Sequence, residues 1–385
     1  MKYLPRDIEQ TVKKYKNIFS VIGITGPRQA GKSTMLRHIL PEYEYVTFDD
    51  YEKIQLFHSD PEKFFSIYDS KVIFDEVQKV PEIFSWIKQK VDEDRENMGK
   101  YILTGSSQFG FIKGVNESLA GRIGMLSLLP LTLSEMQTDL IDETSFGEKS
   151  IYKGSYPEIV MRDFQFSDEW YDSYMNTYIE RDIKTIVEVG NLRDFRRCVS
   201  LLAARIGQEL NMASLSREIG VSVPTIKRWI SALEASYIIF LLPPYFNNFG
   251  KRIVKNSKIY FYDTGLAAFL TGISEKELAE KGPLSGPIFE NFIIADIKKN
   301  IFHTKKQVNM YYLRTNHGVE IDLILDGKNI KEFIEIKSSV TWKTPMTKTV
   351  EAFVEDGTGR LLYQGKTQKY LPNVFIQNYR EFLMA

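Results

Sequence analysis

The sequence predicts an α/β protein that begins with a parallel sheet covered by helices and ends with a second α/β part. Three observations carry this prediction. Short β-rich runs alternate with helical patterns over residues 19–105, as they do in parallel α/β units. A glycine-rich turn joins the first of these runs to the first helix. After about residue 283, one helix is followed by several strands, whereas the stretch between the two α/β parts is mostly helical.

The β-rich runs and helical patterns give the expected elements in chain order. In the first part we expect strands at Phe19–Thr25, Tyr43–Phe48, Lys71–Phe74 and Lys100–Leu103, and helices at Lys32–Ile39 and Ile83–Val91. Residues 122–180 predict mostly helix, with a turn at 154–157. In the last part the expected strands are Val308–Leu313, Glu320–Leu325 and Glu332–Ile336.

Composition limits the class of protein. Lys and Arg total 50 and Asp and Glu total 50, so the net charge favours neither nucleic acid nor another charged partner. Cys198 is the single cysteine, which excludes an internal disulfide framework and a cysteine-rich metal cluster. The first residues carry charges where a signal peptide has an apolar core. The longest apolar stretch, Tyr237–Phe246, is too short to span a bilayer and contains two prolines. We therefore expect a cytoplasmic protein without a membrane partner.

A nucleotide site is indicated by residues 26–33, whose sequence GPRQAGKS fits the Walker A pattern at every specified position. Its glycines allow successive backbone N–H groups to surround phosphate oxygens, and the helix that follows presents its positive end. Lys32 is expected to reach the β- and γ-phosphates, and the Ser33 hydroxyl to bind Mg²⁺. The residues expected around the nucleotide are Gly26, Pro27, Arg28, Gln29, Ala30, Gly31, Lys32, Ser33 and Thr34.

A second motif supports nucleotide hydrolysis. The apolar run Lys71–Phe74 ends in Asp75 and Glu76, which is the Walker B form. Asp75 is expected to hold Mg²⁺ through water, and Glu76 to activate or orient the attacking water. A solvated strand end is the alternative, but the pair follows the glycine-rich loop at the spacing of α/β units. The sequence therefore predicts a protein that binds ATP and Mg²⁺ and hydrolyses ATP.

Two further polar residues are candidates for the same reaction. A third apolar run ends in Thr104, and in an additional-strand ATPase this run lies between the strands that carry the two motifs. We favour Thr104 over Ser106 as the residue that positions the γ-phosphate or the water. Arg122 is a candidate γ-phosphate sensor, or an arginine finger offered to a neighbouring subunit of a homo-oligomer. A surface arginine without a catalytic role is the alternative.

The middle of the chain predicts a helix-turn-helix followed by a two-stranded wing. Gly220 ends the first helix, Ser222 caps the second, and Pro224 fits its first turn. Tyr237–Leu242 resembles the first strand of a wing and Lys258–Tyr262 its return. Four apolar residues of the second helix recur at helical spacing and are expected to face a core: Ile226, Trp229, Ile230 and Leu233.

Basic residues make DNA a candidate partner of this middle part. Lys and Arg outnumber Asp and Glu over residues 181–230, and a basic cluster falls where the tip of the wing is expected: Lys251, Arg252, Lys255 and Lys258. Thr225, Lys227 and Arg228 stand where a recognition helix would meet DNA. The alternative is a winged-helix domain used for protein packing, whose basic residues are solvated.

The last part carries a second set of chemically specific residues. One expected strand carries Asp322, and the next carries Glu335 and Lys337, which alternation places on one face. A hairpin turn at residues 326–328 is expected to bring that face near Asp322. Glu290, on the helix upstream, is a further candidate carboxylate.

Such carboxylates bind Mg²⁺ through oxygen ligands, and the metal polarises a phosphodiester. Lys337 would position or activate the water. This acid–acid–lysine order is that of the PD-(D/E)xK phosphodiesterases. The alternatives are a charged edge face on a small sheet, and a nuclease-like fold without activity.

With these residues in view, the chain resembles a prokaryotic family of AAA-type ATPases with a C-terminal domain of unknown function. The resemblance implies an ATPase module, a winged-helix middle and a restriction-endonuclease-like C-terminal domain, but no settled biological role. It covers nearly the whole length and is carried by Tyr3–Asp7, Ile24–Ser33, Phe74–Gln78, Leu103–Ser107, Leu119–Arg122, Gly154–Glu158, Tyr178–Asp182, Glu320–Asp322 and Glu335–Lys337.

These observations combine into a domain plan and three hypotheses of function. The plan is an AAA-type P-loop ATPase domain at 1–135, a mostly helical connector at 136–190, a winged-helix-like domain at 191–270 and a PD-(D/E)xK nuclease-like domain at 271–385. In the leading hypothesis, nucleotide state controls a DNA-binding winged helix and a nuclease. The first rival is a regulatory NTPase switch with an inactive nuclease-like interaction domain. The second is a DNA-binding regulator with a slow ATPase.

Overall fold

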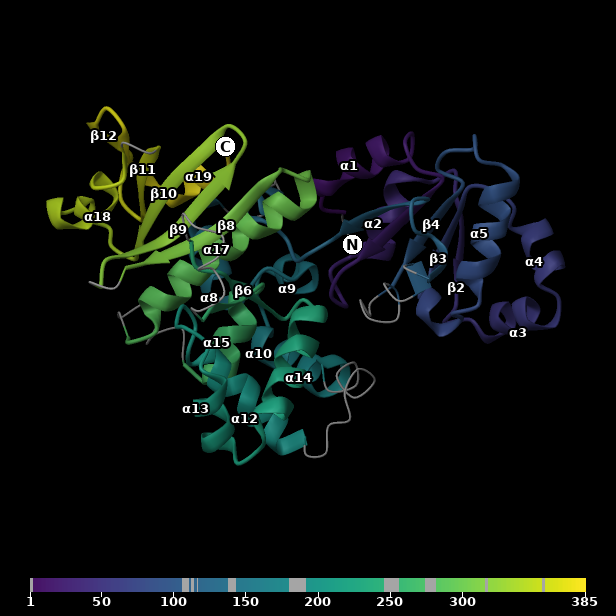
Figure 1. Cartoon of the computed structure of the whole chain (residues 1–385), viewed down its shortest axis with the longest axis horizontal. Helices are drawn as coiled ribbons and strands as arrows, with labels where there is room; N and C mark the ends of the chain where they lie inside the picture. The colour runs from purple at the N-terminus through teal and green to yellow at the C-terminus, as the bar shows by residue number, and fades with distance from the viewer. Residues whose placement is uncertain are drawn as a thin grey trace. The chain divides into compact units, whose positions relative to one another are not determined.

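The computed structural model describes residues 3–105, 111, 114–115, 117–137, 143–179, 192–245, 256–273, 282–315, 318–354 and 357–385. The chain forms two compact units (Figure 1). The first holds Met1–Leu131, Ala235–Tyr237 and Phe302–Lys305; the second holds Thr132–Glu234, Ile238–Ile301 and Lys306–Ala385. Among the described helices, none combines the length and the apolar character that crossing a bilayer requires.

The first unit is built on a five-stranded parallel sheet in the order β2-β3-β4-β1-β5. Its strands are β1 (Val21–Thr25), β2 (Glu44–Thr47), β3 (Val72–Asp75), β4 (Tyr101–Thr104) and β5 (Ile123–Ser127). Helices cover both faces, so the central strands are buried on both sides and read as continuous apolar runs. The expected place of β4, between β1 and β3, is confirmed. The expectation of mostly helix after residue 122 is wrong at β5, because that strand completes the sheet beside β1.

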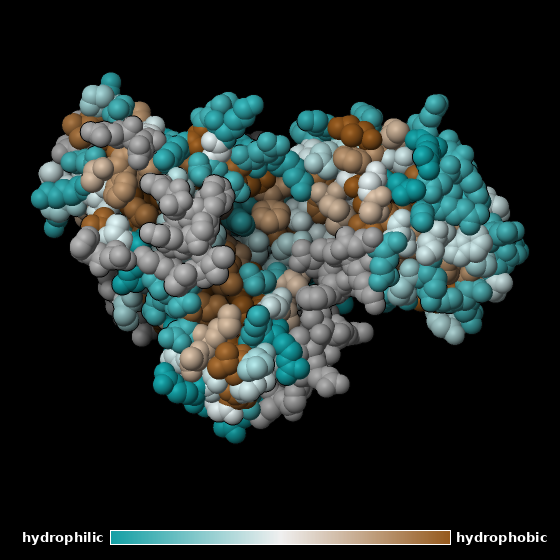
Figure 2. All heavy atoms as spheres, in the orientation of Figure 1, coloured by the Kyte–Doolittle hydropathy of each residue, from teal (hydrophilic) through white to brown (hydrophobic). Residues whose placement is uncertain are grey.

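Two apolar clusters hold the helices of the first unit against the sheet. The helices α1 (Ile8–Tyr15) and α2 (Lys32–Ile39) cover one face. The other face is covered by α3 (Tyr51–Ser59), α4 (Pro61–Ile67) and α5 (Ile83–Glu93), with the 3₁₀ turn η1 (Val77–Lys79). Figure 2 shows mostly hydrophilic residues over α4 and α5, because their apolar side chains face inward.

The second unit begins with helices. They are α7 (Leu133–Met136), α8 (Glu143–Lys153), α9 (Pro157–Met161), α10 (Ser167–Tyr174), the π-helix η2 (Met175–Ile179), α12 (Leu192–Ala203), α13 (Met212–Ile219), α14 (Val223–Ala235) and α15 (Thr264–Thr271). The hairpin β6 (Ile239–Leu242) and β7 (Lys258–Phe261) is antiparallel. The expected turn at Gly220 is confirmed, because this glycine is left-handed with φ 87°. The apolar positions expected to face a core, Ile226, Trp229, Ile230 and Leu233, are buried.

A six-stranded mixed sheet ends the second unit, in the order β12-β13-β11-β10-β9-β8. The strands are β8 (Val308–Arg314), β9 (Glu320–Gly327), β10 (Ile330–Lys337), β11 (Thr358–Tyr363), β12 (Gln368–Leu371) and β13 (Val374–Asn378). Its helices are α17 (Ser285–Thr304), η4 (Thr344–Met346), α18 (Lys348–Glu351) and α19 (Tyr379–Leu383). β8, β9 and β10 form an antiparallel meander, and β10, β11 and β13 run parallel. The predicted domain boundaries at 135, 190 and 270 stay predictions.

Candidate functional site

The glycine-rich loop joins β1 to α2, as expected. Gly26 and Gly31 have φ values of 144° and 91°, which L-residues with a Cβ rarely adopt. A Cβ at Gly26 would also collide with the backbone oxygen of Leu128. The loop therefore depends on glycine at both positions, and it ends where α2 presents its first N–H groups at Lys32.

Lys32 is folded back over this loop. Its ammonium donates hydrogen bonds to the carbonyl oxygens of Gly26 and Pro27, each at 2.9 Å, and the residue is only 6% exposed. These two contacts hold the charge at the mouth of the loop. An incoming phosphate group can replace the neutral carbonyl acceptors with charged oxygens, which form stronger hydrogen bonds.

Asp75 is the point where the other predicted residues meet. It ends β3, and its Oδ2 accepts a hydrogen bond of 2.8 Å from the Ser33 hydroxyl. The Thr104 hydroxyl also donates to Asp75, from the end of the neighbouring β4. Ser33, Asp75 and Thr104 are thus brought together at the carboxyl edge of the sheet. Tyr45, which the sequence reasoning missed, donates its hydroxyl to the same carboxylate. Hard oxygen donors in this arrangement suit Mg²⁺.

Glu76 follows at the end of the same strand. Its backbone has φ 56°, and the Gln78 side chain donates a hydrogen bond of 2.6 Å to its Oε2. Burial raises the pKa of Glu76, and the charge of Lys32 opposes that shift. A carboxylate with a raised pKa is a better proton acceptor, as a residue that activates water requires.

Arg122 does not join these residues within one chain. It directly precedes β5, and its carbonyl accepts a hydrogen bond from Val21, the first residue of β1. The loop at Gly26 lies five residues further along parallel strands, roughly 16 Å away. The Arg122 guanidinium instead forms a bidentate pair with Asp92 of α5, at 2.8 and 2.9 Å. A γ-phosphate sensor in the same chain is not supported by this geometry, and a finger offered to another subunit stays a prediction.

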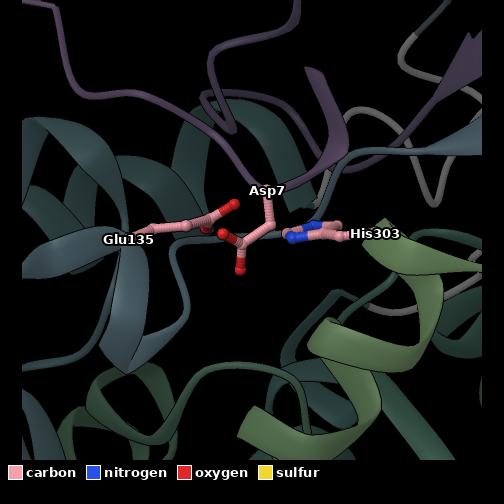
Figure 3. A group of neighbouring side chains, drawn as sticks. All are labelled: Asp7, Glu135 and His303. Carbon is pink, nitrogen blue, oxygen red and sulfur yellow. The ribbon is translucent and has the colours of Figure 1, made fainter. Parts of the chain in front are cut away.

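Arg6 positions the loop from the other side, a role that the sequence reasoning did not assign. This buried residue donates to the carbonyl of Ala30, inside the loop, at 2.9 Å and to the carbonyl of Leu129 at 2.6 Å. It precedes α1, where Figure 3 shows the neighbouring Asp7 beside the imidazole of His303 in the first unit. His303 accepts a hydrogen bond from the Leu129 backbone at 3.1 Å. The only sequence signal for this position was its place in Tyr3–Asp7, one of the segments that carry the family resemblance.

Tyr237 is a second residue of the first unit that only the tertiary structure brings to the loop. Its buried hydroxyl lies 2.8 Å from the hydroxyl of Thr25, the residue before Gly26, and 3.0 Å from that of Ser127. Burial raises the pKa of the Tyr237 phenol, so it stays a neutral hydrogen-bonding group. No pattern in the sequence marks it. Ser106 and Ser107 lie outside the described residues, as do Arg181 and Asp182.

The carboxylate centre of the second unit forms where β9 and β10 pair. The expected hairpin is present, with Ile330 opposite Gly327. The Lys337 ammonium lies 2.5 Å from Oε1 of Glu335 and 3.8 Å from Oδ2 of Asp322. Asp322 also accepts a hydrogen bond of 2.8 Å from the backbone of Ile336. Asp322, Glu335 and Lys337 are therefore brought together as the spacing predicted.

Glu290 joins this centre from α17, and β7 supplies two residues that were not expected there. The Tyr260 hydroxyl donates a hydrogen bond of 2.6 Å to Oε1 of Glu290. The Lys258 ammonium lies 3.8 Å from the same oxygen and 2.5 Å from Oε1 of Glu320. Lys258 is 3% exposed, so its inclusion in a solvated basic cluster at a wing tip is wrong. The other three members of that cluster, Lys251, Arg252 and Lys255, lie outside the described residues.

The charges of this centre do not balance. Four carboxylates, those of Glu290, Glu320, Asp322 and Glu335, face the two ammonium groups of Lys258 and Lys337. The Arg314 guanidinium also pairs with Glu320 and is shared with a fifth carboxylate, that of Glu209. Burial, followed by the charge of Asp322, raises the pKa of Glu290 and of Glu335 to about 7. Oε2 of Glu335 is buried and accepts no hydrogen bond from the described residues. A buried carboxylate oxygen without a donor, in a centre with surplus negative charge, can take a divalent cation, although the carboxylates of Glu290, Asp322 and Glu335 do not all lie within 4.8 Å of one another.

The predicted DNA-contact residues lie together on α14. Lys227 and Arg228 are exposed, Thr225 is half-buried, and the Thr225 hydroxyl lies 2.8 Å from that of Ser222. Neither Lys227 nor Arg228 forms an ion pair with any residue that the structure describes. Two neighbouring exposed cations at the start of a helix can meet phosphates.

Three family models match separate parts of the chain. Residues 19–137 match the AAA domain, residues 147–277 a domain of unknown function (DUF8612), and residues 285–382 a domain of unknown function (DUF4143). Two curated relatives, the uncharacterised proteins Mb2031c of Mycobacterium bovis and Rv2008c of Mycobacterium tuberculosis, are each 29% identical over 338 residues. That alignment covers 87% of this chain and 74% of each relative.

Among solved structures, the Walker-type ATPase PABY2304 of Pyrococcus abyssi is similar with 16% identity and a TM-score of 0.43. The match covers 70% of this chain and 96% of that one. The match of residues 19–137 to the AAA domain, together with the parallel sheet and its glycine-rich loop, supports an AAA-type P-loop ATPase.

Proposed function

We propose that this chain couples ATP binding and hydrolysis in its first unit to metal-dependent cleavage of DNA at the carboxylate centre of its second unit. The observation that carries the proposal is the surplus charge of that centre. With all groups ionised, the five carboxylates of Glu209, Glu290, Glu320, Asp322 and Glu335 against the three cations Lys258, Arg314 and Lys337 leave a formal charge of −2, which one divalent cation neutralises.

In the first unit, this chain's residues would bind and orient the nucleotide. Lys32 and the backbone of the loop would hold the phosphates, and Thr104 would position the γ-phosphate or the water. Glu76, oriented by Gln78, would accept a proton from the attacking water. Ser33 and Asp75 would hold Mg²⁺, which supplies charge neutralisation on the phosphate oxygens.

In the second unit, Asp322 and Glu335 would hold the divalent cation, which would polarise the phosphodiester. Glu290 would have to move closer to join them, because the three carboxylates do not all lie within 4.8 Å of one another. Lys337 lies against both Asp322 and Glu335, so it would orient the attacking water beside them. Lys258 and Tyr260 would fix Glu290 and Glu320. Lys227 and Arg228, exposed on α14 after the turn at Gly220, would contact the DNA backbone.

One observation favours a second candidate function, a regulatory NTPase switch whose nuclease-like domain is inactive. The ammonium groups of Lys258 and Lys337 already lie 2.5 Å from carboxylate oxygens of the centre. Carboxylates already paired in this way can serve as a structural ion-pair network. A DNA-binding regulator with a slow ATPase is the remaining alternative, and it rests on the exposed residues of α14.

The test is cleavage of single- and double-stranded DNA and RNA by the full chain, with Mg²⁺ or Mn²⁺, with and without ATP. We expect cleavage by the wild type and none by Asp322→Ala. Asp326→Ala, on the same strand, is the matched control and should cleave normally. Lys32→Ala should abolish ATP hydrolysis and shows whether ATP gates cleavage. ATP hydrolysis without cleavage of any substrate would instead support the switch, and normal ATP hydrolysis by Lys32→Ala would contradict the assignment of the first unit.

A further inference from the structure

A groove opens in the second unit where β10 and β11 end. Its volume is about 580 Å³, within the range of sites that bind small ligands. Val340, three residues after Lys337, lines one side, and Gln364, directly after β11, lines another. Since β10 and β11 run parallel, their carboxyl ends reach the same edge of the sheet.

The register of these strands places the groove on the face that carries the carboxylate centre. Lys337 is paired with Tyr363 and Glu335 with Leu361, and paired residues of neighbouring strands point to the same face. Tyr363 lines the groove, and Trp342 packs against Leu361 and Tyr363 in one apolar cluster. The groove thus continues from Glu335 and Lys337 along their own face.

The side chains that line the groove are chemically unlike those of the centre. None of the ten lining residues is acidic, although the neighbouring centre holds four carboxylates. The lining offers amides and hydroxyls, among them Gln364, Thr341 and Gln368, and a single cation, Lys366. Lys366 is exposed and forms no ion pair with any residue that the structure describes. Trp342 is half-buried and presents an aromatic surface beside these donors.

We propose that this groove binds a single strand of nucleic acid beside the carboxylate centre. The proposal rests on the proposed function, because it assigns the path of the strand that is cleaved there. Hydrogen-bond donors, one ammonium group and one aromatic surface match a phosphate and an adjacent base of a single strand. A duplex backbone would require several cations in a row, and the groove has one. The nucleic-acid strand runs from Trp342 and Lys366 toward Lys337, so that its scissile phosphate reaches the carboxylate centre.

The experiment measures binding of a fluorescent twelve-nucleotide oligothymidylate to the full chain in EDTA, where no metal-dependent cleavage occurs. Lys366→Ala should weaken binding roughly tenfold, the lower end of the effect of one lost hydrogen bond to a charged group. The substitution should also make the plot of log binding constant against log salt concentration less steep, by about 0.7. Lys369→Ala, an exposed lysine of β12 outside the lining, is the matched control. Binding to Trp342→Phe should no longer change the intrinsic fluorescence of the protein.

Equal affinity of wild type and Lys366→Ala, or equal competition by unlabelled duplex, would overturn the groove assignment. An oligonucleotide-dependent fluorescence change that persists in Trp342→Phe would do the same. The outcome is separable from that of the proposed function, because binding is measured without metal and cleavage with it. If Lys366→Ala weakens binding but the wild type cleaves nothing in Mg²⁺ or Mn²⁺, the groove is a binding site and the nuclease proposal is wrong. If Lys366→Ala cleaves as well as the wild type, the groove does not bind the cleaved strand, and the nuclease proposal stands.

Discussion

The Nζ atom of Lys258 lies 2.5 Å from Oε1 of Glu320, and the lysine is almost completely buried. β7, a strand of the middle hairpin, therefore supplies a cation to the carboxylate centre on the final sheet of the same unit. The pKa of Lys258 is raised, because Glu290 and Glu320 stabilise its charge more than burial disfavours it. The hairpin and the centre are thus parts of one electrostatic arrangement.

Removing this cation should destabilise the second unit. In Lys258→Met, the half-buried Glu290 and Glu320 lose an ion-pair partner, while Tyr260 still donates to Glu290 and Arg314 still pairs with Glu320. Breaking a fully buried pair on one side costs about 3–5 kcal/mol, and this partly exposed network should lose less than that. We expect a lower urea midpoint by circular dichroism at pH 8. Lys348→Met, at an exposed lysine of α18, is the control. An unchanged urea midpoint in Lys258→Met would show that the ion pairs make no net contribution to the stability of the folded state.

The stability of the metal-free protein should fall as the pH rises from about 5 to 8. Glu290 and Glu335 have folded pKa values raised from 4.5 to about 7, so between these values the folded state binds more protons than the unfolded state. The stability that they contribute is fully present below pH 4.5 and is lost as the pH passes through about 7. Urea midpoints measured in EDTA across this range test the prediction.

Asp322→Asn is the variant that isolates this effect. The charge of Asp322 is the largest cause of the raised pKa values after burial, so its removal should make the stability less dependent on pH between 5 and 8. Asp326→Asn, on the same strand, controls for other titrating groups. Identical pH profiles of wild type and Asp322→Asn would contradict the electrostatic coupling.

Arg6 should affect nucleotide affinity although it lies outside the loop. Arg6→Ala loses the hydrogen bonds to the carbonyls of Ala30 and Leu129, so the loop is less well held before ATP binds. We expect roughly tenfold weaker binding of a fluorescent ATP analogue, the effect of one to two hydrogen bonds. Arg6→Lys should rescue only part of the loss, because a single ammonium lacks the fork geometry that reaches two carbonyls. Lys13→Ala, at an exposed lysine of α1, is the control. If Arg6→Ala binds the analogue as tightly as the wild type, Arg6 does not position the loop for ATP.

Arg122 and Asp92 give a test of action across subunits. If Arg122 only pairs with Asp92, then Asp92→Asn and Arg122→Ala should have the same small effect on ATP hydrolysis. If Arg122 acts as a finger in a homo-oligomer, mixing Arg122→Ala with Glu76→Gln subunits should restore hydrolysis, since each supplies what the other lacks. Steady-state ATPase rates of the mixture distinguish the two results. A mixture as inactive as its separate components would rule out the finger.

The loop of the candidate nucleotide site could be placed from the sequence because its residues are consecutive in the chain. Glycines at 26 and 31, Lys32 and Ser33 are consecutive in the chain, and the conformation of the loop requires them at these spacings. Asp75 and Thr104 could be added because each ends an apolar strand, and parallel strands bring their carboxyl ends to one edge. The hairpin of β9 and β10 is likewise local, so Asp322, Glu335 and Lys337 could be placed together.

Tertiary structure decided everything that depends on distant segments meeting. Arg6, Tyr45 and Tyr237 reach the nucleotide site from parts of the chain without any matching pattern. The sequence predicts Lys258 as a solvated basic residue, and only the pairing of β7 places it among carboxylates. The sequence predicts Arg122 as a catalytic candidate, but the register of β5 places it at the end of the sheet opposite the glycine-rich loop. A sequence pattern specifies residue type and local conformation, whereas the neighbours of a side chain are set by how sheets and helices pack, which no local spacing encodes.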